Sequence, residues 1–100
     1  MIESGAVVGF GSDWFVSTLN PLECIQVAVT HNLLDGTKEP LLPHERITLK
    51  QALYAYTRGS AYINFLDAES GSLEVGKAAD LVVLDKVKKG RIGINCQEFV

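Results

Sequence analysis

The chain has 100 residues, 47% of them hydrophobic and 21% charged, with a formal net charge of −3. This length allows one small domain at most, and the composition is typical of soluble globular proteins. No apolar run reaches the roughly 18–20 residues that a membrane-spanning helix requires. Residues 1–11 also lack the basic start that is typical of a secretory signal. We therefore expect a cytoplasmic protein without a membrane partner.

The first predicted element is a strand at residues 6–10, which are short, apolar and rich in valine. Such runs are typical of strands buried on both faces of a parallel sheet. The run ends at Gly11-Ser12-Asp13. Because α/β folds place their chemistry in loops that follow strands, Asp13 is the first candidate site residue.

A helix is predicted over residues 21–30. Asn20 stands at the N-cap position, Pro21 suits the first helical position because its missing N–H needs no partner there, and Glu23 occupies the capping-box position. Strand, loop and helix in this order are half of a βαβ unit. The start of the chain therefore predicts an α/β fold.

Residues 31–43 collect asparagine, aspartate, glycine and proline, which predicts a surface loop. Thr48 and Gln51 then form a second capping box, which opens a helix with a single apolar face. That face comprises Leu49, Ala52, Leu53 and Tyr56. We expect Gly59 to interrupt this helix and residues 60–66 to add one or two further turns.

Two short pieces complete the predicted order: an extended stretch at residues 72–75 and a strand at residues 81–84. Beyond Asp85 the pattern decays into a tail with four basic side chains and one acidic side chain. The basic residues are Lys86, Lys88, Lys89 and Arg91. Without interleaved aromatic side chains, these charges are a weak signal for nucleic acid, so we expect a solvated tail and no nucleic-acid partner.

Asp13 has two interpretations on its residues alone. A carboxylate directly after a buried strand is held at the rim of the sheet, where it can bind a metal ion or act as a base. It can also cap the loop by accepting backbone N–H groups ahead of the helix. Spacing by itself favours the capping role.

Other metal-binding residue types are sparse. His31 and His44 are the only histidines and belong to no H-x-H or H-E-x-x-H pattern, so we interpret both as surface histidines. Cys24 and Cys96 are too far apart for a clustered zinc site and are interpreted as ordinary thiols. Because a catalytic zinc ion takes about three protein ligands, we expect no cofactor in this chain alone.

Two stretches resemble segments of the amidohydrolase superfamily, in the branch that includes N-substituted formamide deformylases. Residues 11–17, GSDWFVS, with Asn20-Pro21-Leu22 after them, are similar to its GSDWPVS…PL segment. Residues 71–85, GSLEVGKAADLVVLD, are similar to its GSLExGKxADLVVLD segment. Between them, residues 49–61 are similar to its ALxxYT…A helix, in the right order and spacing.

The resemblance implies an α/β fold: the C-terminal fragment of a metal-dependent hydrolase (β/α)8 barrel plus part of the flanking composite β-sandwich. Residues 1–70 would then hold the last βα unit of the barrel and the following helices. Residues 71–85 would form return strands of the β-sandwich, and residues 86–100 a divergent basic tail.

The resemblance also implies a parent enzyme that uses zinc or another divalent metal to hydrolyse amide-type C–N bonds of a small-molecule substrate. In such an enzyme the residue at the position of Asp13 is catalytic: it binds the metal or its hydroxide and shuttles the proton. Trp14 would shape the substrate pocket.

Three differences from the family's pattern limit how far its properties apply to this chain. The metal-binding histidines of the family would lie ahead of Met1, Phe15 replaces the usual proline, and the segment after Asp85 does not resemble the family's final strand. We expect the C-terminal portion of an amidohydrolase, inactive alone, in which Asp13 binds metal only if another segment completes the ligands. The alternatives are a stand-alone interaction module, whose residues 6–10 pair with another copy or a partner chain, and one half of a split hydrolase.

Overall fold

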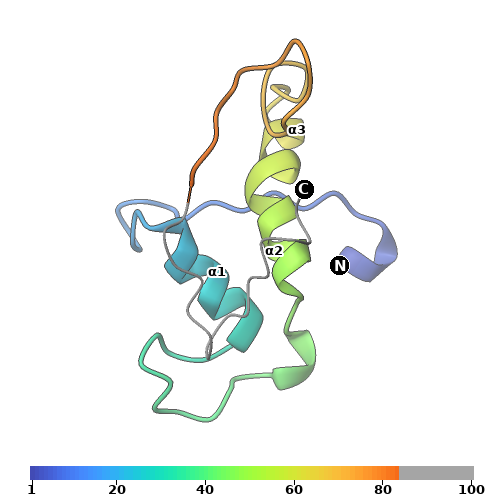
Figure 1. Ribbon diagram of the computed structural model, residues 1–100. Helices are drawn as coiled ribbons and strands as arrows, with labels where there is room; N and C mark the ends of the chain where they lie inside the picture. Colours follow the sequence, from blue (N-terminus) through green and yellow to red (C-terminus); the bar gives the residue numbers. More distant parts are fainter. Residues whose placement is uncertain (84–100) are drawn as a thin grey trace.

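The computed structural model describes residues 1–83, in which every regular element is helical (Figure 1). In chain order the elements are η1 (Ile2–Ser4), α1 (Pro21–Thr30), η2 (Pro43–Glu45), α2 (Leu49–Tyr54), η3 (Ala55–Gly59) and α3 (Ser60–Ile63). The first and third are 3-10 turns, whereas η3 is a π-helical turn. Because α2, η3 and α3 follow one another without a break, we refer to them together as the long helix. Within these residues, no helix has the length and apolar character needed to cross a membrane.

Helix α1 begins and ends where the sequence predicts. The side chain of Asn20 accepts a hydrogen bond from the N–H of Leu22 at 3.1 Å, and Pro21 takes the first helical position. The helix ends after Thr30 because His31 adopts a left-handed backbone conformation with φ 50°. The capping box predicted for Glu23 is absent, since Asn20 caps Leu22 instead.

The start of the long helix also follows the prediction. Thr48 donates its N–H to Oε1 of Gln51 at 2.8 Å, and Gln51 donates its N–H to Oγ1 of Thr48 at 3.2 Å, which completes the capping box. Gly59, however, does not interrupt the helix. The helix widens into the π turn of η3 at this point and continues to Ile63.

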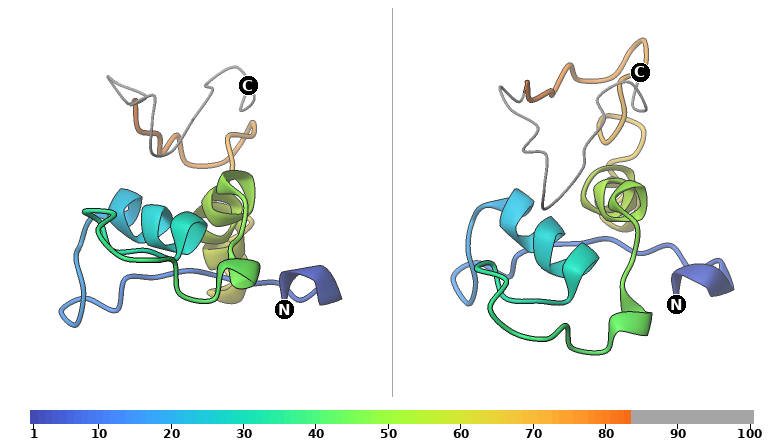
Figure 2. Two further views of the ribbon diagram at one scale, coloured as in Figure 1. Left: turned by 90° about the horizontal axis from the view of Figure 1, so that it is seen from below. Right: turned by 60° about the horizontal axis from the view of Figure 1, so that its bottom comes forward.

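The two main helices and the N-terminal segment form a small layered arrangement. Helix α1 packs beside α2, and the extended residues 6–11 cross behind the long helix before a loop leads into α1 (Figures 1 and 2). The buried apolar side chains among residues 1–83 are few and mostly small: Ile25, Ala52, Ala55 and Ala61. At the crossing, the ring of Phe10 meets the ring of Tyr56 edge to face, with centroids 5.5 Å apart.

The predicted α/β fold is wrong for the described residues, because none of residues 1–83 forms a β-strand. Residues 6–10 are extended, but they lie against a helix, where the N–H of Phe10 donates to the carbonyl of Ala55 at 3.0 Å. A strand requires a second strand whose N–H and C=O groups face its own in a ladder, and the apolar pattern does not say whether one is present. Within residues 1–83, neither the predicted last barrel strand nor any part of a predicted return strand of the β-sandwich is formed.

The same correction applies to the predicted extended pieces after the long helix. Residues 72–75 belong to a loop, and residues 81–83 form no strand and are exposed. The end of the predicted strand, Leu84, and the predicted tail at residues 86–100 with Cys96 lie outside the described residues.

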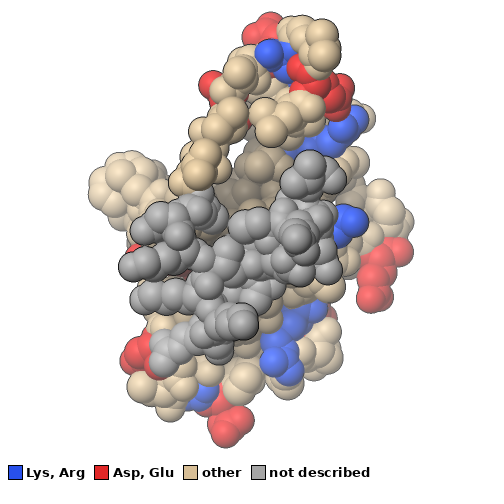
Figure 3. Space-filling model, in the orientation of Figure 1, with Lys and Arg blue, Asp and Glu red and all other residues tan. Residues whose placement is uncertain are grey.

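A lysine holds the loop that follows the long helix. The ammonium group of Lys77 donates to the carbonyl of Asp67 and, at 2.8 Å, to the hydroxyl of Ser72, and it lies 3.7 Å from the carboxylate of Glu74. The hydrogen bond from Ser72, and then the charges of Lys77 and Arg58, lower the pKa of Glu74. On the face drawn in Figure 3, charged side chains of both signs are interspersed around this loop.

Candidate functional site

Asp13 is the first residue of a tight turn between the extended residues 6–10 and α1, and Trp14 and Phe15 form the tip of this turn. Its φ of 51° is left-handed, a conformation that aspartate adopts more readily than most other L-residues. The carbonyl of Asp13 accepts the N–H of Val16 at 2.7 Å, which closes the turn. The carboxylate is exposed and forms no hydrogen bond or ion pair within residues 1–83.

Other residues cap the loop. The N–H of Asn20 donates to Oγ1 of Thr18 at 3.1 Å, and the side chain of Asn20 then caps α1. Asp13 accepts no backbone N–H from any described residue through its carboxylate. The structure therefore assigns the capping role, which spacing had favoured for Asp13, to Thr18 and Asn20.

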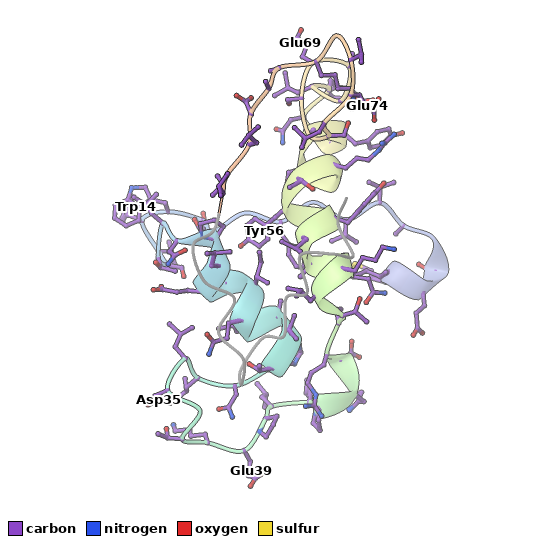
Figure 4. The ribbon with its side chains drawn as sticks, in the orientation of Figure 1. Trp14, Asp35, Glu39, Tyr56, Glu69 and Glu74 are labelled. Atoms are coloured by element: carbon purple, nitrogen blue, oxygen red, sulfur yellow. The ribbon has the colours of Figure 1, made fainter. Side chains whose placement is uncertain are left out.

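A cavity of about 350 Å³ opens between the turn, α1 and the long helix. Its lining includes Phe10, Ser17, Glu23, Cys24, Val27 and Tyr56. Neither Asp13 nor Trp14 contributes to this lining, and Trp14 is 61% exposed. In Figure 4, Trp14 lies at the outer edge of the turn, whereas Tyr56 lies on the side of the long helix that faces α1. The predicted role of Trp14 in a substrate pocket stays a prediction.

Cys24 and Tyr56 meet inside this cavity. Burial, and then the hydrogen bond with the thiol of Cys24, raise the pKa of Tyr56 to about 12. The phenol therefore stays neutral at physiological pH and acts there through hydrogen bonds. Sequence patterns gave no sign of this pair, because the two residues come from different helices that meet only in the fold.

Within residues 1–83, neither histidine pairs with Asp13. Nδ1 of His31 lies 2.8 Å from the carbonyl oxygen of Leu41 and thereby helps to close the loop after α1. His44 is exposed, with Nε2 3.9 Å from a carboxylate oxygen of Glu45. In the part of the chain that the structure describes, no three His, Cys, Asp or Glu side chains gather as metal ligands. These residues therefore do not fit a catalytic zinc ion, which takes about three protein ligands.

Comparison with known proteins gives the family. Residues 1–95 match the amidohydrolase family. The chain belongs to this family. The resemblance seen in residues 11–17 and 71–85 is thereby confirmed, and the chain carries a hydrolase sequence.

Three curated relatives illustrate the match of this amidohydrolase chain. Protein LONG AFTER FAR-RED 3 of Arabidopsis thaliana is 39% identical over 84% of this chain and 14% of its own length. The N-substituted formamide deformylase of Arthrobacter pascens is 37% identical over 86% of this chain and 16% of its own length. The 5'-deoxyadenosine deaminase of Methanobrevibacter smithii is 38% identical over 85% of this chain and 19% of its own length.

The chain thus spans less than a quarter of the length of these relatives. No solved structure matches it significantly.

Proposed function

We propose that this chain contributes Asp13 as the proton-transferring carboxylate of an amidohydrolase that cleaves amide-type C–N bonds of a small-molecule substrate. The observation that carries the proposal is the exposed carboxylate of Asp13, which has no partner within residues 1–83 and belongs to the first residue of a turn closed by Val16. Membership of the amidohydrolase family and the relative named as an N-substituted formamide deformylase support it.

The chemistry of amide hydrolysis suits a carboxylate that is not engaged by its neighbours in residues 1–83. Amide hydrolysis requires a group that takes a proton from the attacking water and delivers it to the leaving nitrogen. An ionised carboxylate accepts the first proton, and the protonated acid can donate it again. A carboxylate already engaged in capping the loop would be less available for both steps, and Thr18 and Asn20 leave Asp13 free of that task.

The metal of such an enzyme would need ligands from outside residues 1–83. Residues 1–83 offer no cluster of three ligand-type side chains, so zinc or another divalent ion would be held by other residues, with Asp13 as at most one ligand. We therefore propose that this chain alone is inactive. Those ligands would come from another segment or from a second polypeptide, as in a split hydrolase.

Metal analysis and an activity assay of the purified chain test this proposal. We expect well below one zinc ion per chain and no release of amine from an N-substituted formamide. One tightly bound metal ion per chain that disappears in Asp13→Ala would contradict it, because a site would then exist within this polypeptide.

The role of Asp13 itself is tested by grafting this chain into the deformylase of Arthrobacter pascens in place of the matched segment. Asp13→Asn should lower kcat of an active graft by about 100-fold or more, the range expected for loss of an acid–base group. Asp80→Asn is the matched control because Asp80 is also exposed. Equal activity of the two variants would show that Asp13 takes no part in the reaction.

A second candidate function is self-association, favoured by the backbone of residues 6–9. Within residues 1–83, the N–H and C=O groups of the exposed Val7 form no hydrogen bond, although the segment is extended. An extended segment with free backbone groups is a template for an added strand. Val7 is also half exposed and apolar.

Sedimentation of the chain at several concentrations tests the second candidate. We expect a dimer that Val7→Lys shifts towards monomer, because a charge at the edge opposes strand addition. Val75→Lys serves as the control, since this valine is fully exposed outside the segment. A monomer at all concentrations, or an equal effect of both substitutions, would reject the candidate.

A further inference from the structure

The turn that carries Asp13 starts from an anchored residue. The N–H of Phe10 donates to the carbonyl of Ala55 at 3.0 Å, and the carbonyl of Phe10 accepts the hydroxyl of Ser60 at 2.7 Å. The ring of Phe10 also packs edge to face on Tyr56. Backbone donor, backbone acceptor and side chain of this residue are therefore all fixed to the long helix.

The residues that directly follow Phe10 make no comparable contacts with other residues of the described range 1–83. A Cβ added to Gly11 would meet no atom within 4 Å, and Asp13, Trp14 and Phe15 are all exposed. The next fixed point is Asn20, which caps α1. The segment that carries Asp13 is thus held at its two ends, Phe10 and Asn20. The position of Phe10 therefore sets where the Asp13 turn begins.

The π turn explains why the helix can hold Phe10. In η3 the carbonyl of Ala55 accepts the N–H of Ser60, five residues later, instead of the usual i+4 donor. The same carbonyl also accepts the N–H of Phe10, and the hydroxyl of Ser60 lies 2.8 Å from it. Ser60 therefore bridges the open turn of the helix and the carbonyl of Phe10.

We infer that Ser60 is a positioning residue for the Asp13 turn: its hydroxyl fixes the carbonyl of Phe10, three residues before the carboxylate and 50 residues away from Ser60 in sequence. The functional value of this positioning rests on the role proposed for Asp13. The structural coupling between Ser60 and the turn does not depend on that role. The coupling and the role of Asp13 can therefore be tested separately.

The coupling is tested in the full chain by amide hydrogen exchange and by the fluorescence anisotropy of Trp14, which is the only tryptophan. Ser60→Ala should speed exchange at the amides of Phe10 and Val16 by about fivefold, the effect of losing one hydrogen bond, and should lower the anisotropy. Exchange within α1 should not change. Ser70→Ala is the matched control, since the hydroxyl of Ser70 makes only a local 3.4 Å contact with the carbonyl of Leu66.

The outcomes separate the two proposals. Faster exchange confined to the turn supports positioning by Ser60, whereas unchanged exchange or equal acceleration throughout α1 overturns it, the latter by showing a general structural role. In the deformylase graft, Ser60→Ala should lower kcat about fivefold with KM unchanged. If Asp13→Asn leaves the graft fully active while Ser60→Ala still loosens the turn, the proposed role of Asp13 fails and the coupling stands.

Discussion

The α-carbon of Gly59 lies directly against the carbonyl group of Val8. A Cβ added to Gly59 would overlap the oxygen of Val8 and would lie 3.1 Å from its carbonyl carbon. The two residues are 51 positions apart in the sequence. Their contact brings the extended N-terminal segment close enough for the hydrogen bonds of Phe10 to form.

We predict that Gly59→Ala destabilises the protein by roughly 1–3 kcal/mol, because the added methyl group must displace backbone atoms. Helix propensity alone predicts the opposite sign, since alanine is favoured over glycine by about 1 kcal/mol within a helix. Urea denaturation followed by far-UV circular dichroism measures the difference. Gly11→Ala is the control because its Cβ would meet open space. Equal stability of both variants would mean that the backbone of Val8 leaves room for a methyl group at Gly59.

Substitution of Thr48 tests the capping box of the long helix. Thr48→Ala removes the side-chain acceptor for the N–H of Gln51 and should cost about 1 kcal/mol. Thr48→Ser keeps the hydroxyl and should cost much less. The midpoint of thermal unfolding separates the two, and a loss as large in Thr48→Ser as in Thr48→Ala would attribute the effect to packing of the methyl group.

The raised pKa of Tyr56, about 12, predicts a loss of stability at alkaline pH. The folded state holds this proton more tightly than the unfolded state, whose tyrosine has an ordinary pKa of about 10. The stabilisation is therefore complete below pH 10 and declines between pH 10 and 12. Tyr56→Phe should flatten this part of the stability profile and remove the late step from the tyrosinate absorbance titration. A profile unchanged by the substitution would show that the titration of Tyr56 does not cause the alkaline loss of stability.

Lys77 should control the loop between Asp67 and Ala78. Its side chain is only 12% exposed, and Lys77→Met would leave the carbonyl of Asp67 without its donor. We expect faster limited proteolysis within this loop, with little change in α1. Lys50→Met provides the comparison, because Lys50 lies exposed at the start of the long helix. Equal cleavage in both variants would show that the ammonium group does not hold the loop.

Sequence reasoning succeeded where the deciding contacts are local. The N-cap of α1 and the capping box of the long helix join residues two or three positions apart, so their side chains alone specify both helix starts. The family also followed from motifs within single segments.

Sequence reasoning failed where contacts between distant segments determine the structure. Residues 6–10 have the composition of a buried strand, but only the fold shows that their neighbour is a helix. Gly59 resembles a helix breaker, whereas its actual role depends on Val8. The link between Ser60 and Phe10 likewise has no signature in either segment. For Asp13 the sequence left two roles open, and it took the observed cap at Thr18 and Asn20 to argue against one of them.

The π turn at Ala55–Gly59 makes the number of residues there as important as their identity. Each residue turns an α-helix by about 100°, so deleting one residue from this stretch would restore a regular helix and rotate Ser60 away from Phe10. The loop at residues 32–40 can absorb an insertion at small cost, because loop-closure entropy grows slowly with length. In an alignment of amidohydrolases with this chain, gaps should therefore collect at residues 32–40 and avoid the π turn.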